Sequence, residues 1–119
     1  MNRFGVILVG LFFICGNVNA TDYWTVKIKG GVISKSNSFT AIHLGGYQPH
    51  ETGKQWTQCN NGWIRFDKTH SGTVVSEKSI DRMLAVALTA FKTNGFVRVG
   101  IDRDASNNCY TNQMWDRGG

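Results

Sequence analysis

The sequence lacks most of the features that mark common functional classes. Of its 119 residues only Pro49 is a proline, and no internal repeat or low-complexity segment is present. The 13 lysines and arginines are dispersed, so there is no basic cluster of the kind that binds nucleic acid. The histidines His43, His50 and His70 show no metal-ligand spacing with one another or with the cysteines. We therefore expect neither a nucleic-acid partner nor a metal.

Sequence patterns for catalysis are also missing. No histidine accompanies a nucleophile motif such as G-x-S-x-G, and Gly30-Gly31 and Gly45-Gly46 lack the context of a phosphate-binding loop. The pair of carboxylates in Asp102-Arg103-Asp104 fits a solvated strand end and turn better than an acid–base pair. We expect a protein without catalytic activity and without a cofactor.

What is present at the N-terminus is the pattern of a signal peptide. Arg3 supplies a basic start, and residues 4–15 form an apolar run that is too short to span a bilayer comfortably. Val18-Asn19-Ala20 then predicts cleavage after Ala20. We expect a secreted or periplasmic protein with no transmembrane segment after cleavage.

Two other interpretations of this segment are an uncleaved membrane anchor and lipid attachment at Cys15. The short apolar run argues against the first, and the bulky Phe13-Ile14 argues against the second. With residues 1–20 removed, residues 21–119 are the right length for one small domain.

Export changes the cysteine count. Cys15 leaves with the signal peptide, so Cys59 and Cys109 are the two cysteines of a chain sent to an oxidising compartment. We predict a disulfide between them, which would stabilise the domain by about 4 kcal/mol on the chain-entropy model. Only Arg3 is lost from the charges, so the mature chain has 12 basic and 8 acidic residues, a net charge of +4.

Apolar and polar residues alternate in five segments, which predicts five strands. They cover residues 23–34 (with a bend at Gly30-Gly31), 39–44, 63–67, 96–102 and 109–115. Residues 76–94 predict a helix with Ser76 as N-cap and a stop at Asn94-Gly95. The helix residues expected to face the core are Ile80, Met83, Leu84, Ala87, Leu88 and Phe91.

This order predicts a mostly β domain with one helix. Five strands with a helix between the third and fourth describe the OB-fold, a five-stranded barrel in which the helix plugs one end. The disulfide would then run across the barrel. An open α+β sheet with one covering helix fits the same order.

The longest irregular segment, residues 45–58, supplies the candidate binding residues. Long loops in compact domains are usually functional or disordered. Sugar rings stack on aromatic side chains, while their hydroxyls need a few fixed polar partners. We therefore expect Tyr47, His50 and Trp56 to bind a glycan. The competing interpretation is that Trp56 packs beneath its own loop.

Two segments are similar to parts of a known family. Residues 79–99 resemble the family's helix, the glycine that ends it and the Val-Arg-hydrophobic strand that follows. Gly31-Val32-Ile33-Ser34 resembles the family's early strand. On these segments the chain resembles the B subunits of pentameric bacterial toxins, in the subtilase-cytotoxin and pertussis-like group. The resemblance implies a virulence protein whose five copies form a ring, bind a host cell-surface glycan and deliver a separate toxic A subunit.

The family's sugar site does not carry over to this chain. In those relatives a serine just before the early strand binds sialylated sugars, whereas this chain has Lys27-Ile28-Lys29-Gly30 there. The resemblance therefore implies glycan binding but not the position of the site.

The helix supplies the expected contacts of a homopentamer. Small or weakly polar residues on its second face would allow close approach of a neighbour, and the candidates are Arg82, Val86, Thr89, Ala90 and Thr93. The strand at 96–102 is expected to lie at an edge and to pair across subunits. The alternative function is a monomeric secreted or periplasmic inhibitor whose loop, residues 45–58, enters the cleft of a hydrolase.

Overall fold

A computed structural model describes residues 21–35 and 39–118, so the expected signal peptide lies outside the described residues. The elements follow the order β2 (Asp22–Lys27), β3 (Gly31–Lys35), β4 (Phe39–His43), β5 (Trp63–Arg65), α1 (Glu77–Thr93), β6 (Phe96–Arg103) and β7 (Cys109–Gly118). A short 3-10 turn, η2 (Asn60–Gly62), precedes β5. The prediction of a mostly β domain with one helix is confirmed.

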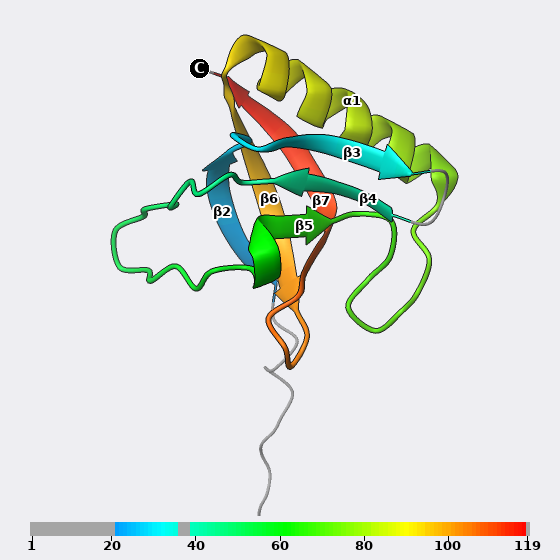
Figure 1. The fold of residues 1–119 in the computed structure, drawn as a ribbon, viewed down its shortest axis with the longest axis horizontal. Coiled ribbons are helices and arrows are strands. Elements are labelled where there is room, and N and C mark those ends of the chain that lie inside the picture. The colour runs from blue at the N-terminus through cyan, green and yellow to red at the C-terminus, as the bar shows by residue number, and fades with distance from the viewer. Residues whose placement is uncertain (1–20, 36–38, 119) are drawn as a thin grey trace, which may run out of the picture.

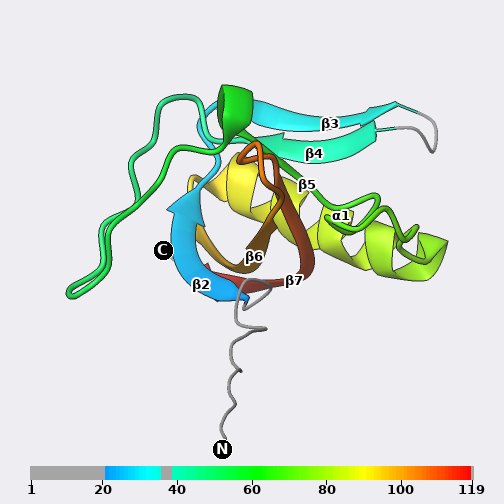
Figure 2. The ribbon, with the colours of Figure 1, turned by 90° about the horizontal axis from the view of Figure 1, so that it is seen from below.

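The strands form one mixed sheet in the order β2-β6-β7-β5-β4-β3 (Figure 1). The β5–β7 pair is parallel and the other four pairs are antiparallel. Figure 2 shows the sheet curling, so that β3 and β4 lie across from β6 and β7. Consecutive strands β2 and β3 form the two edges of this sheet, which is therefore open and not the closed OB-fold barrel that the sequence predicted.

The predicted bent first strand is two separate strands. β2 pairs with β6 whereas β3 pairs with β4, so the partner changes at the glycine pair. Gly31 has φ of 129°, a conformation that side chains rarely adopt. Because this segment counts as two strands, the helix follows the fourth strand, β5, and its predicted place between the third and fourth strands was wrong.

β6 is not an edge strand. It lies between β2 and β7, so both sides of the strand are paired, and the prediction that residues 96–102 pair across subunits was wrong. The neighbouring edge, β2, is covered by side chains of the long loop. Glu51 accepts a hydrogen bond from the Thr25 N–H at 2.8 Å, and Lys54 Nζ donates to the Tyr23 carbonyl. These side chains satisfy backbone groups that an edge strand would otherwise expose.

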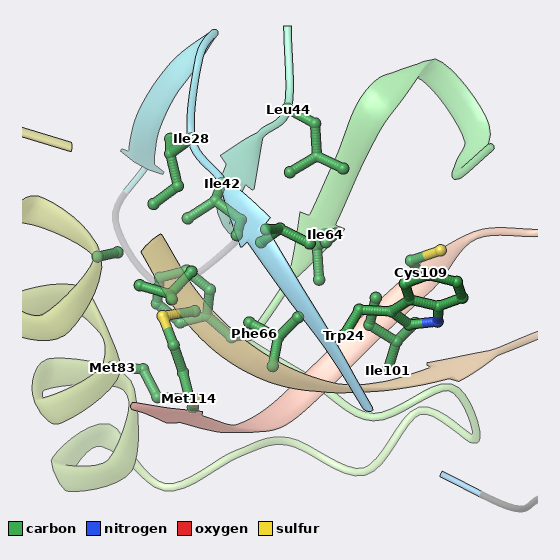
Figure 3. Packing of buried hydrophobic residues seen from close by; sticks show 14 of the residues in the cluster. Trp24, Ile28, Ile42, Leu44, Ile64, Phe66, Met83, Ile101, Cys109 and Met114 are labelled. Atoms are coloured by element: carbon green, nitrogen blue, oxygen red, sulfur yellow. The ribbon is translucent and has the colours of Figure 1, made fainter. Parts of the chain in front are cut away.

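The core lies inside the curl, between the sheet and α1. Alternate side chains of β2 and β6 point into it, as the sequence predicted, and so do those of β4 and β5. Its largest fully buried members include Trp24, Val26, Ile42, Leu44, Ile64, Phe66, Val97, Val99 and Ile101. Figure 3 shows Met83 of α1 and Met114 of β7 at one end of this cluster, and Trp24 and Cys109 at the other.

The helix begins and ends where the sequence predicts. Ser76 Oγ accepts a hydrogen bond from the Ser79 N–H at 3.2 Å, which caps the first turn. Asn94 takes the left-handed conformation that ends the helix. Within residues 21–35 and 39–118 no helix is long and apolar enough to cross a membrane.

The buried face of α1 matches the predicted stripe in part. Met83 and Ala87 are buried, and Ile80 and Leu84 pack against the core, as predicted. Leu88 and Phe91 were predicted wrongly, because they are 37 % and 41 % exposed, and the small Ala90 is buried instead.

The burial of α1 also affects the candidate ring contacts. Ala90 is buried in its own chain and Val86 packs against the core, so Ala90 is not available to a neighbouring subunit. Arg82, Thr89 and Thr93 are exposed.

Candidate functional site

The predicted disulfide joins Cys59, just before η2, to Cys109, the first residue of β7. It closes a sequence separation of 50 residues, and both cysteines are buried. Beside it the Asn60 N–H donates to the Asn107 carbonyl at 2.9 Å. The bridge and this hydrogen bond hold η2 against the turn between β6 and β7.

A pocket of about 200 Å³ opens where these two turns meet β4, β5 and β7. Three aromatic rings line it, those of Phe39, Trp63 and Tyr110. The polar lining comes from the amides of Asn60, Asn61 and Asn108 and from the guanidinium of Arg65. We call this the Trp63 pocket.

Trp63 is braced from two sides. The Phe39 ring lies edge-on to it with centroids 5.6 Å apart, and the His43 ring does so at 4.5 Å. His43 Nδ1 accepts a hydrogen bond from the Gly45 N–H at 3.0 Å, so Nε2 carries the ring proton and donates to the Asn61 carbonyl at 2.9 Å. The half-exposed indole is therefore held in a fixed orientation.

The polar side of the pocket is a chain of amides. Asn60 Nδ2 donates to Asn108 Oδ1 at 2.9 Å, and Asn108 Nδ2 donates to Asp104 Oδ2 at 2.9 Å. Asn61 has φ of 58°, a left-handed conformation that asparagine tolerates better than most residues, and its side chain is exposed. The turns thus present fixed amide donors and acceptors beside the indole.

Arg65 is paired with Asp67. Nε donates to Oδ1 at 3.0 Å and Nη2 to Oδ2 at 2.7 Å, and the Thr40 N–H donates to the same carboxylate at 3.3 Å. Burial raises the pKa of Asp67, but the hydrogen bonds from Arg65 and Thr40 outweigh burial and leave the pKa below its usual value. The hydrogen bond to Asp67 raises the pKa of Arg65. At neutral pH the two charges therefore balance each other.

The residues predicted from the long loop lie elsewhere. Trp56 packs edge-on against Trp24 of β2 with centroids 5.2 Å apart, and Tyr47 lies 6.4 Å from the Phe96 ring of β6. Both are partly buried against the core, while His50 is exposed. The two rings thus contact different strands, and their role in binding stays a prediction.

Sequence reasoning missed the Trp63 pocket, although one signal pointed to it. Asparagines adjoin both disulfide cysteines, in Cys59-Asn60-Asn61 and in Asn107-Asn108-Cys109. A bridge between the cysteines brings these asparagines together, and Trp63 follows Asn61 by two residues.

Among the residues with described positions, no three His, Cys, Asp or Glu side chains are grouped to hold a metal ion. The chain matches no protein-family model, no curated protein and no solved structure. The function is therefore inferred from the chemistry of the pocket and from the sequence.

Proposed function

We propose that this protein binds glycans in the Trp63 pocket and does not alter them chemically. The observation that carries the proposal is a braced, half-exposed indole beside a fixed chain of amides. The apolar face of a sugar ring stacks on such an indole, and its hydroxyls exchange hydrogen bonds with amide groups. Tyr110, a lining residue, is protonated at neutral pH, and burial and the negative charge of Asp104 raise its pKa further.

The strand order supports this position for the site. If β2 and β3 are counted as two halves of one strand, the sheet has the strand order of an OB-fold. We propose that this open sheet is an OB-like arrangement. Oligosaccharides bind OB-folds on the second and third strands and on the loop between the last two strands. In this chain those parts carry Phe39, Trp63 and Asn108, which line the pocket.

The proposal extends to an exported homopentamer that delivers a separate toxic A subunit. The resemblance to toxin B subunits carries this part, and exposed apolar side chains support self-association. Leu88 and Phe91 are exposed on α1, with Val74 in the segment before it, and Trp115 is 43 % exposed on β7. Met114 is buried, so Trp115 points away from the core. A closed ring needs two different patches on each copy. The apolar side chains of α1 and Val74 would form one patch, and Trp115 on β7 would form the other.

The second candidate is a monomeric inhibitor that acts through residues 45–58. Glu51 accepts a hydrogen bond from Arg98 at 2.7 Å, and Lys54 lies 3.2 Å from Asp22. These contacts order the loop, which extends beyond the sheet (Figure 1), before any partner binds. A monomeric protein with no glycan affinity would favour this function.

The test of glycan binding is an array of immobilised glycans probed with the wild type and three variants. Trp63→Ala removes the stacking surface, and Asn61→Gly removes an amide while keeping a residue that tolerates positive φ. His50→Ala alters an exposed side chain of the long loop, outside the pocket. We expect the first two variants to lose the signal and His50→Ala to keep it. Unchanged binding by Trp63→Ala and Asn61→Gly would refute the proposal.

A further inference from the structure

We infer that the Trp63 pocket selects one uncharged sugar ring and rejects sialylated and other anionic glycans. The inference rests on the proposed function and names its substrate class. It concerns which sugar binds, not whether a sugar binds.

The size of the pocket limits the ligand. Its volume of about 200 Å³ is below the range of roughly 300–1,000 Å³ that holds drug-sized ligands. One pyranose ring fits such a space, whereas a sialic acid with its carboxylate, N-acyl group and glycerol chain requires more. A longer glycan would therefore insert one terminal ring and leave the rest outside.

The charges around the pocket disfavour an anion. Among the lining residues that the structure describes, Arg65 has the one charged side chain, and Asp67 neutralises it through two hydrogen bonds. An anionic sugar would have to displace Asp67, which is 5 % exposed and could not be rehydrated easily. A second carboxylate, that of the partly buried Asp104, lies behind the lining residue Asn108 and accepts a hydrogen bond from its Nδ2 at 2.9 Å. That carboxylate would repel an anionic ligand.

The amides favour hydroxyl groups. An asparagine side chain both donates and accepts hydrogen bonds, and so does a sugar hydroxyl, whereas a carboxylate only accepts. Asn60 and Asn108 already use one donor each within the amide chain. Their remaining groups therefore match hydroxyls of a neutral ring better than a ligand carboxylate.

The test compares neutral and sialylated glycans that share the same core, such as lactose and sialyllactose, together with glucose-, mannose- and N-acetylglucosamine-terminated probes. We expect the wild type to bind at least one neutral probe and to bind its sialylated counterpart about tenfold more weakly or worse, because like charges in contact are costly. The affinity for the neutral probe should not change between low and high salt.

Variants separate the two proposals. If the wild type binds neutral glycans and Trp63→Ala abolishes this binding, both proposals are supported. If the wild type binds sialylated glycans and Trp63→Ala abolishes that binding, the proposed glycan site stands but the inference about neutral sugars is overturned. Binding of either class that Trp63→Ala leaves unchanged, or no binding to any glycan, refutes the proposed function itself.

Discussion

Glu51 Oε2 accepts a hydrogen bond of 2.7 Å from Arg98 Nη1 on β6, although the two residues are 47 positions apart. The same oxygen accepts the Thr25 N–H of edge strand β2 at 2.8 Å. One carboxylate therefore fastens the long loop to the sheet and covers part of the sheet's edge.

This contact predicts a pH-dependent contribution to stability. Burial raises the pKa of Glu51, but the hydrogen bonds from Thr25 and Arg98 and the nearby positive charges outweigh it, so the folded pKa lies below the usual value of 4.5. A carboxyl with a lowered pKa stabilises the fold above its unfolded pKa and loses this contribution as the pH falls through the folded value. Glu51→Gln should therefore cost about 1–2 kcal/mol at pH 7 and progressively less below about pH 4.5.

Urea unfolding of the wild type and Glu51→Gln at pH 7, 5 and 3 measures this difference. A free-energy difference that stays constant over the three pH values would show that the charge of Glu51 does not stabilise the fold.

A second prediction concerns the buried carboxylate beside the pocket. Asp67→Asn removes the charge that balances Arg65 and at least one of its two hydrogen bonds. We expect a loss of about 2–3 kcal/mol in the free energy of unfolding, as for other hydrogen bonds to charged groups. Asp81→Asn, on the exposed surface of α1, is the matched control and should change stability by less than about 0.5 kcal/mol. Equal effects of the two variants in urea unfolding would contradict this role of Asp67.

The disulfide provides a third prediction. Reducing Cys59–Cys109 should lower the free energy of unfolding by about 4 kcal/mol, because it releases a loop of 50 residues in the unfolded chain. Reduction should also release η2 from the β6–β7 turn and weaken glycan binding. Unfolding and binding are measured with and without a reducing agent. Two free thiols in the non-reduced protein would contradict the bridge.

Local patterns of the sequence were enough to predict much of the fold. Alternation gave the inward faces of β2, β5 and β6, and Ser76 and Asn94 marked the ends of α1. The cysteine pairing followed from the expected compartment, without any knowledge of geometry. Each of these features is determined by residues that are neighbours in the sequence or by the chemistry of a single residue type.

The features that escaped prediction depend on how distant segments meet. The Trp63 pocket combines β4, η2, β5 and the start of β7, which are brought together by the pairing of β5 with β4 and with β7 and by the disulfide. On α1 the prediction failed for Leu88 and Phe91, which are exposed, while the small Ala90 is buried in close contact with the strands. The edge position of β2 and β3 likewise depends on the partners of each strand, which alternation does not reveal.

The exposed side chains of α1 lead to a fourth prediction. Leu88→Lys places a charge on the exposed apolar flank and should convert a ring of about five chains into monomers. Thr52→Lys, which places the same charge on the exposed long loop, is the control and should leave the mass unchanged. Light scattering at micromolar concentration measures both. A wild type that stays monomeric, or a ring that Thr52→Lys but not Leu88→Lys disrupts, would contradict the proposed contact.

Glycan binding at Trp63 is tested most directly by following the four indole N–H signals of the unmutated protein by NMR during titration with a neutral glycan that the array selects. Binding in the Trp63 pocket predicts a large, saturable shift of the Trp63 signal, while the signals of Trp24 in the core and Trp115 on β7 change little. A saturable shift confined to Trp56 would return the site to the long loop, and a titration that moves none of the four signals would contradict glycan binding at this pocket.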